Sequence, residues 1–217
     1  MTERKALIFD FDGLIVDTEA AEMLAWKKEF ARHGLDFDMA KYINTIGSNG
    51  PEARYEADLL AACPDESRSH DQIWADHTRH SIEEGLKLPA LPGVLELIGQ
   101  AKAMGLLLAI GSSSGDFWIE ALAKGLGIYD CFDTIVTFDQ VRLAKPAPDI
   151  YLKVLENLKV SPKNALVLED SYNGVLAANR AGIRVVAVPT SLTRHLDFKL
   201  AEEVLASLLE LKLEKYF

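Results

Sequence analysis

Short apolar runs alternate with segments of helical periodicity along most of this chain. From Pro92 onward, each apolar run is followed by a stretch in which apolar positions recur at the spacing of one helix face. The expected strands are Leu7 to Phe9, Leu106 to Gly111, Thr134 to Thr137, Ala165 to Leu168 and Arg184 to Val188; the expected helices are Gly93 to Met104, Gly115 to Gly125, Asp149 to Leu158 and Gly174 to Ala181. This alternation predicts an α/β fold, with a Rossmann-like, doubly wound parallel sheet and helices on both faces.

The segment between the first two expected strands has a different pattern. It shows helical periodicity and almost no strand signal, and its expected helices are Thr18 to His33, Met39 to Ile46, Pro51 to Ala62 and Ser69 to Glu84. We therefore expect residues 17–87 to form an all-helical cap domain, inserted into an α/β catalytic core domain of residues 1–16 and 88–217.

Two stretches, one with a polar stripe and one rich in leucine, lie outside this main pattern. His70, His77 and His80 fall on the last helix of the insertion, where a solvated or cap-facing polar stripe is a better interpretation than a metal site. The leucine-rich stretch Leu200 to Leu213 is expected to pack against the sheet rather than to form a groove for a partner.

Composition excludes several classes of protein. The 217 residues are 49% hydrophobic, enough for one core and a small accessory domain, and the formal net charge of −10 argues against a nucleic-acid partner. The chain lacks a signal peptide and a bilayer-length apolar run, so we expect a cytoplasmic protein with no membrane partner. Cys63 and Cys131 have neither a metal-ligand spacing nor a disulfide framework.

Two carboxylates follow the first strand directly. Asp10 and Asp12 are two residues apart at the point where the apolar run ends and Gly13 begins a turn. At the carboxyl edge of an open α/β sheet, both side chains can point into the crevice where such folds bind ligands. Taken alone, the Asp-Gly pair fits a simple tight turn after a surface strand equally well.

Three further segments also follow strands and also carry groups suited to phosphate. They are Ser112-Ser113-Ser114-Gly115, Ala144-Lys145-Pro146-Ala147-Pro148-Asp149, and Glu169-Asp170 after Ala165 to Leu168. The chain thus carries four motifs in a fixed order: DFDG, a serine after the second strand, KPAPD and LEDS. With these motifs it resembles the haloacid dehalogenase superfamily, in particular its phosphatase and phosphomutase branch typified by β-phosphoglucomutase. In that family the insertion is a mobile helical cap over the active site.

The chemistry of phosphate monoesters assigns roles to the first two acids. Uncatalysed hydrolysis of such esters is so slow that enzymic accelerations reach on the order of 10²¹, so several groups must act together. Asp10 is the candidate nucleophile, forming an aspartyl-phosphate, and Asp12 is the candidate general acid and base.

Convergence of four carboxylates requires a cation. Asp10, Asp12, Glu169 and Asp170 would repel one another, and hard oxygen ligands favour Mg²⁺ over zinc. The resemblance implies that the ligands are the Asp10 carboxylate, the Asp12 backbone carbonyl and the Asp170 side chain, with Glu169 either direct or in the outer coordination sphere. Without the other motifs, Glu169-Asp170 would be interpreted as a cap for the following helix.

The remaining candidates contact the substrate. Lys145 precedes two prolines that restrict the backbone, and its ammonium would offset charge near Asp10. Ser112, and more weakly Ser113, can contact a phosphoryl oxygen at the start of a helix, although serines also cap helices. In the cap loop, Gly47 and Asn49 are candidate substrate contacts because the corresponding loop of the resembled family tests the leaving group.

The cap decides between a phosphatase and a sugar phosphomutase. The mutases of this branch carry a histidine shortly after the first motif and an arginine in the cap loop, where this chain has Glu22 and Gly50. The loss of two cations weakens binding of a second phosphate and favours a phosphatase, although Arg54 could supply a displaced charge. A dehalogenase does not need Mg²⁺ or Asp12, and a non-catalytic phosphate-binding module would not need every motif. We expect a small phosphorylated metabolite as substrate and a monomer or weak homodimer.

Overall fold

The chain folds into two compact units. The structure is a computed structural model that describes residues 3–45, 55–63 and 66–217. One unit, here the core unit, comprises Met1–Asp17 and Pro89–Phe217, and the other, the cap unit, comprises Thr18–Leu88. Within the described ranges, no helix has the length and apolar character needed to cross a membrane.

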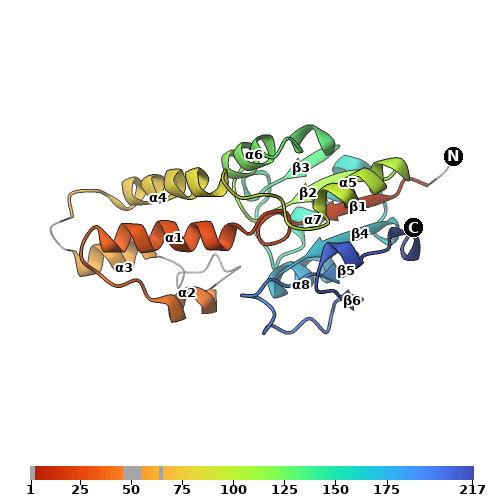
Figure 1. Cartoon of the computed structure of the whole chain (residues 1–217). Coiled ribbons are helices and arrows are strands. Elements are labelled where there is room, and N and C mark those ends of the chain that lie inside the picture. Colours follow the sequence, from red (N-terminus) through yellow and green to blue (C-terminus); the bar gives the residue numbers. More distant parts are fainter. Residues whose placement is uncertain (1–2, 46–54, 64–65) are drawn as a thin grey trace. The chain divides into compact units, whose positions relative to one another are not determined.

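The core unit is built on a six-stranded parallel sheet (Figure 1). The strand order is β3-β2-β1-β4-β5-β6, and every neighbouring pair is parallel. The strands are β1 (Ala6–Phe9), β2 (Leu107–Gly111), β3 (Thr134–Val136), β4 (Ala165–Glu169), β5 (Arg184–Ala187) and β6 (Glu203–Val204). The chain builds the sheet outward from β1 in one direction through β3 and then in the other from β4, which confirms the predicted doubly wound α/β fold.

Helices connect the strands and cover the sheet. They are α5 (Val94–Ala103), α6 (Asp116–Gly125), α7 (Asp149–Leu158) and α8 (Tyr172–Arg180). Alternation along the strands sends Ile8, Ala109 and Val167 to one face, where they form a buried core with residues of α7 and α8. Because parallel crossovers are right-handed, α5 and α6 lie on the opposite face. The sheet is therefore buried on both sides, as its continuous apolar strands require.

The C-terminal stretch contains a strand that the sequence analysis missed. Glu203–Val204 pairs with β5 as the edge strand β6. Leu208, Leu211 and Leu213 are buried after it, whereas Leu200 and Leu209 are exposed. The leucine-rich segment thus extends the sheet through β6, and Leu208 lies next to Gly93, just before α5. Packing of its leucines against the sheet itself stays a prediction.

The cap unit contains helices and connecting loops but no strand among its described residues. Its helices are α1 (Thr18–Ala31), α2 (Met39–Thr45), α3 (Tyr55–Ala62) and α4 (His70–Gly85). Their shared core consists of Trp26, Phe30, Tyr42, Tyr55, Leu59 and Ile73. The sequence therefore predicted the helical character of this insertion correctly.

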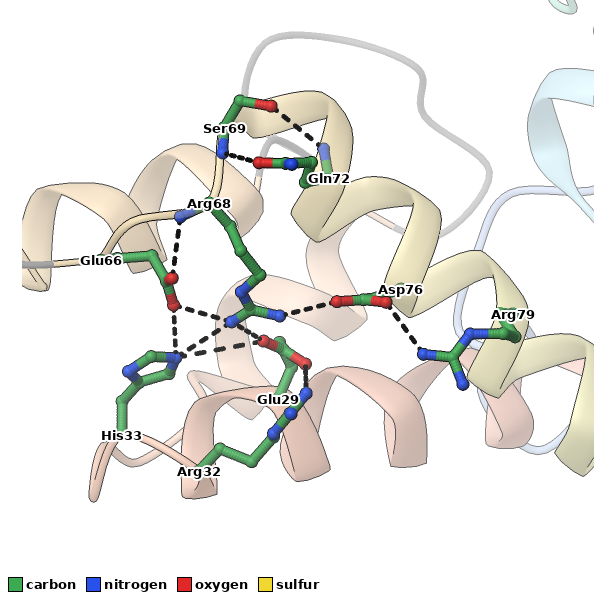
Figure 2. Close-up of polar contacts among 9 residues, drawn as sticks. All are labelled: Glu29, Arg32, His33, Glu66, Arg68, Ser69, Gln72, Asp76 and Arg79. Carbon is green, nitrogen blue, oxygen red and sulfur yellow. Dashed lines mark hydrogen bonds and ion pairs between the residues drawn. The ribbon is translucent and has the colours of Figure 1, made fainter.

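An ion network around Arg68 joins α1 to the segment that precedes α4 (Figure 2). The guanidinium of Arg68 contacts Glu29, which is fully buried, and donates to Glu66 Oε2 at 2.7 Å and to Asp76 Oδ2 at 3.0 Å. His33 Nε2 lies 2.9 Å from Glu66 Oε2. Arg32 Nη1 also donates to Glu29 Oε2, at 3.2 Å. Because a buried carboxylate is costly without a partner, Arg68 and Arg32 together allow Glu29 to lie inside this helical unit.

His77 departs from the expected polar stripe. His70 is exposed, but His77 is only 3% exposed and its ring stacks on Trp26 with centroids 4.0 Å apart. Its Nε2 contacts Ser81 Oγ at 3.2 Å. The stripe expectation was therefore wrong for His77, because helical spacing alone does not tell on which side a ring is covered by a neighbouring helix. Burial lowers the pKa of His77 to about 4.

This shift predicts a loss of stability in mild acid. Between its ordinary pKa of 6.5 and about 4, His77 binds a proton in the unfolded chain but not in the folded one, so stability falls as the pH falls. The slope from this one group is about 1.4 kcal/mol per pH unit. We expect His77→Phe, which keeps a stacked ring, to flatten the dependence of urea unfolding on pH between 5 and 7. His195→Gln, at an exposed histidine, should keep the parent slope, and an unchanged slope in His77→Phe would contradict the prediction.

Candidate active site

The two central strands bring three of the predicted carboxylates to one edge of the sheet. β1 and β4 are parallel neighbours in which Phe9 pairs with Leu168. The next residue of β1's chain, Asp10, donates its backbone N–H to the Leu168 carbonyl at 2.9 Å, so it lies at the carboxyl end of β4. Glu169 ends β4 and Asp170 follows it. Asp10, Glu169 and Asp170 are all buried, and ligand oxygens of the three lie within 4.8 Å of one another. This edge is the crevice in which open α/β sheets bind ligands.

Lys145 reaches the same place from the loop before α7. Its Nζ donates to Asp10 Oδ1 at 2.7 Å and to Glu169 Oε1 at 2.6 Å. Burial lowers the pKa of Lys145, but the charges of Asp10 and Glu169 outweigh burial and raise the pKa overall. The ammonium therefore stays charged and holds the two carboxylates together.

Both oxygens of Glu169 are engaged. Besides Lys145, the hydroxyl of Tyr151 donates to Oε1 at 2.5 Å. Oε2 accepts from the backbone N–H of Asp170 at 3.2 Å and from the N–H and hydroxyl of Ser171 at 3.3 and 3.1 Å. Ser171 is the N-cap of α8, so Glu169 also lies at the positive end of that helix. These contacts make Glu169 a rigid acceptor that aims Lys145 at Asp10.

Two glycines leave the space that these carboxylates occupy. A Cβ at Gly174 would lie 1.7 Å from Glu169 Oε1, and a Cβ at Gly13 would lie 2.4 Å from Asp170 Oδ2. Gly13 also has φ of +78°, which favours glycine in any surroundings. The turn after β1 and the start of α8 are thus shaped around the two acids.

The acidic cluster carries more negative charge than Lys145 can balance. Burial and the charge of Glu169 raise the pKa of Asp10 to about 8. Three carboxylates beside one ammonium leave two negative charges when all are ionised, which a divalent cation would balance. Carboxylate oxygens are also the donors that Mg²⁺ prefers, so the residues fit this ion.

The carboxylate of Asp12, two residues after Asp10, accepts hydrogen bonds from three side chains. Its Oδ2 accepts from Ser112 Oγ at 3.1 Å and from Ser114 Oγ at 2.7 Å, and its Oδ1 accepts from Trp118 Nε1 at 2.7 Å. Ser112 follows β2, and its Oγ accepts the Ser114 backbone N–H at 3.0 Å. The carboxylate of Asp12 is near enough to Asp10 to add to the rise in the Asp10 pKa.

The other predicted residues have different outcomes. Ser113 Oγ accepts the backbone N–H of Lys145 at 3.4 Å and so links two loops at this edge. Gly47 and Asn49 lie outside the described residues. Sequence analysis did not single out Tyr151 or Trp118. Both are aromatic residues with a polar group, and each lies about one helical turn beyond a motif. The other buried residues of their helices are aliphatic or small, and this contrast is the sequence signal that could have identified them.

Comparisons with known proteins agree on the family. The model of the haloacid dehalogenase-like hydrolases matches residues 4–182. The chain is 37% identical to the protein CbbY of Rhodobacter capsulatus over 92% of each chain, and 30% identical to hexitol phosphatase B of Escherichia coli over 95% of this chain and 93% of the other. The crystal structure of CbbY from Rhodobacter sphaeroides in complex with xylulose-(1,5)bisphosphate is similar with a TM-score of 0.81, at 30% identity and 96% coverage of both chains. The chain therefore belongs to the haloacid dehalogenase-like hydrolases, as its four motifs predicted, and is a phosphatase of that family.

Proposed function

We propose that this protein hydrolyses a small sugar phosphate or a related phosphorylated metabolite, through an aspartyl-phosphate on Asp10 and with Mg²⁺ bound. The observation that carries the proposal is the contact of Lys145 Nζ with Asp10 and Glu169, at 2.7 and 2.6 Å, inside a buried cluster of acids. A lysine in that place does more than balance charge, because it also faces the position of a phosphoryl group on Asp10.

In the first step, Asp10 is the nucleophile. A carboxylate oxygen of Asp10 bonds to phosphorus while the bond from phosphorus to the alcohol oxygen of the substrate breaks. Asp12 donates its proton to that leaving oxygen, so that an alcohol rather than an alkoxide departs. Lys145 and the hydroxyl of Ser112 face the negative charge that spreads over the phosphoryl oxygens.

In the second step, water regenerates the enzyme. Asp12, now ionised, accepts a proton from a water molecule whose oxygen attacks phosphorus, and the bond between phosphorus and Asp10 breaks. Inorganic phosphate leaves, and Asp12 again carries the proton that it needs for the next substrate. One residue serves as acid and then as base, so the cycle needs no other proton carrier.

Residues already brought together would hold the metal ion. The carboxylates of Asp10 and Asp170 and the backbone carbonyl of Asp12 are the proposed ligands, and Glu169 is occupied by its contacts with Lys145, Tyr151 and Ser171. When bound, Mg²⁺ would act as a Lewis acid that stabilises the charge on the phosphoryl oxygens, and it would neutralise the acidic cluster.

The substrate class follows from the relatives and from the charge of the cap. Hexitol phosphatase B and the xylulose-(1,5)bisphosphate complex of CbbY both point to phosphorylated polyols and sugars. Glu19 and Glu22 lie on α1 of the cap unit, at the start of the segment in which the related mutases carry a cation. The sugar in the CbbY complex carries a second phosphate, but because this chain has carboxylates on this part of α1, we propose that its cap recognises a polar, polyhydroxylated leaving group without one.

A panel of phosphorylated metabolites tests this proposal. We expect inorganic phosphate to be released from sugar or polyol phosphates with Mg²⁺ present, and the rate to fall at least about a hundredfold in excess EDTA and to return with Mg²⁺. β-Glucose 1-phosphate with its bisphosphate activator belongs in the panel. Isomerised sugar without released phosphate would replace hydrolysis by mutase activity, and equal rates with and without the metal would remove Mg²⁺ from the proposal.

A further inference from the structure

We propose that Trp118 and Ser114 are positioning residues that hold Asp12 in place for proton transfer. This inference rests on the proposed function, in which Asp12 is the general acid. Trp118 Nε1 lies 2.7 Å from Asp12 Oδ1, and Ser114 Oγ lies 2.7 Å from Asp12 Oδ2. Each oxygen of the carboxylate thus has a short contact with a different, directional donor.

The first turn of α6 is anchored so that Trp118 has a fixed direction. The carboxylate of Asp116 accepts from Thr137 Oγ1 at 2.5 Å and from Gln140 Nε2 at 2.9 Å, and its backbone N–H donates to Asp139 Oδ2 at 2.7 Å. These bonds tie α6 to the loop that follows β3. Trp118 itself is only 7% exposed, so the ring has little freedom to turn away from Asp12.

The contact of Ser112 with Asp12 explains why two other donors are needed. The hydroxyl of Ser112 has one proton, which it donates here to Asp12 Oδ2. In the proposed function this same hydroxyl faces a phosphoryl oxygen of the substrate, and it cannot donate to both. When the substrate binds, Asp12 loses the bond from Ser112, while Trp118 and Ser114 keep its carboxyl group, which then carries the proton, within reach of the leaving oxygen.

A purely structural role for the indole is the competing explanation. Buried tryptophans usually find a partner for the indole N–H, so the bond to Asp12 could merely satisfy Trp118. The two explanations differ in which substrates suffer when the N–H is lost. An alkyl ester needs a proton on its leaving oxygen, whereas p-nitrophenolate is stable as an anion and does not.

The decisive experiment compares two esters that differ by one methylene group, p-nitrobenzyl phosphate and p-nitrophenyl phosphate, in the parent and in Trp118→Phe. The value of kcat/KM covers only the steps through departure of the alcohol or phenol, so later hydrolysis of the phosphoenzyme does not enter. We expect kcat/KM for the benzyl ester to fall by about tenfold to a hundredfold, the usual effect of losing a hydrogen bond to a charged group, because Asp12 becomes charged as it gives up its proton. The value for the phenyl ester should fall by less than about threefold.

Ser114→Ala provides an independent test and Trp74→Phe a matched control. Ser114→Ala removes the other donor without touching a large side chain and should show the same preference for the phenyl ester. Trp74, on α4 of the cap unit, is half exposed, and its replacement should leave the ratio of the two kcat/KM values unchanged. Equal losses for both esters in Trp118→Phe, or no loss for either, would overturn the positioning role.

An NMR measurement tests the contact without any turnover. The chain has three tryptophans, so the indole N–H signal of Trp118 is identified by its absence from Trp118→Phe. We expect this signal to move upfield in Asp12→Asn, because an amide oxygen is a weaker acceptor than a carboxylate. An unmoved signal would contradict the hydrogen bond. A parent protein that releases phosphate neither from these esters nor from any sugar or polyol phosphate would instead contradict the proposed function, and with it the positioning role of Trp118, while the signal still shows whether the bond exists.

Discussion

Asp10→Asn should reduce phosphatase activity by at least about 10⁴-fold while leaving the fold intact, a loss on the scale seen when a catalytic nucleophile is removed. The amide keeps the shape of the side chain but cannot attack phosphorus. The amide also matches the neutral form of the side chain, which burial and the charge of Glu169 favour by raising the pKa of Asp10 to about 8. We therefore expect the variant, free of metal at neutral pH, to unfold at a urea concentration no lower than that of the parent.

The measurements for Asp10 separate chemistry from folding. Phosphate release reports activity, and acid-quenched protein exposed to a radiolabelled ester should carry label in the parent and none in Asp10→Asn. Asp130→Asn, at an exposed aspartate, is the matched control and should keep full activity. Substantial turnover by Asp10→Asn would remove Asp10 from the role of nucleophile.

Lys145→Met should damage both activity and stability. The change leaves Asp10 and Glu169 facing each other without the ammonium that now lies 2.7 and 2.6 Å from them. Removing one partner of a buried ion pair costs about 3 to 5 kcal/mol. Loss of a charged group that faces the transition state lowers kcat by about 10² to 10³.

Urea unfolding and steady-state kinetics check the two parts of this prediction. Lys153→Met is a matched control, since Lys153 pairs with Glu156 on the exposed side of α7. Its effect on stability should stay within about 0.5 kcal/mol. If Lys145→Met were as stable and as active as this control, the contact with Asp10 and Glu169 would have no functional meaning.

The main elements of the fold were predictable because local pattern and tertiary structure agree. Apolar runs such as Ala165–Glu169 have no polar residue before their end, which is typical of strands covered on both faces. β6 was not predicted because Glu203–Val204 is too short to show an alternation of apolar and polar residues. Its pairing with β5 depends on how the residues between the two strands fold back toward the sheet. The burial of His77 was missed for a related reason, since Trp26 covers it from another helix.

Motifs found the charged members of the site but not the residues that orient them. Asp10 and Asp170 directly follow strands, Glu169 ends β4, and Lys145 lies in the loop between β3 and α7. The topology of the sheet brings these segments to one edge. Tyr151 and Trp118 act through a hydroxyl and an indole N–H on helices, positions at which a buried aromatic residue ordinarily indicates core. Only the direction of these two polar groups, set by tertiary packing, distinguishes them from ordinary core residues.

The position of β1 in the sheet has a consequence for how the protein is synthesised. β1 is translated before its neighbours, which begin at Leu107 and Ala165, so both of its edges stay unpaired until these strands have been made. The helices of the cap unit follow directly in the chain and depend on contacts nearer in sequence, which form sooner. In the nascent protein, the inserted helices can therefore fold while β1 is still an unpaired, exposed apolar strand. Chaperones that bind such strands should have their largest effect on folding before β4 has left the ribosome.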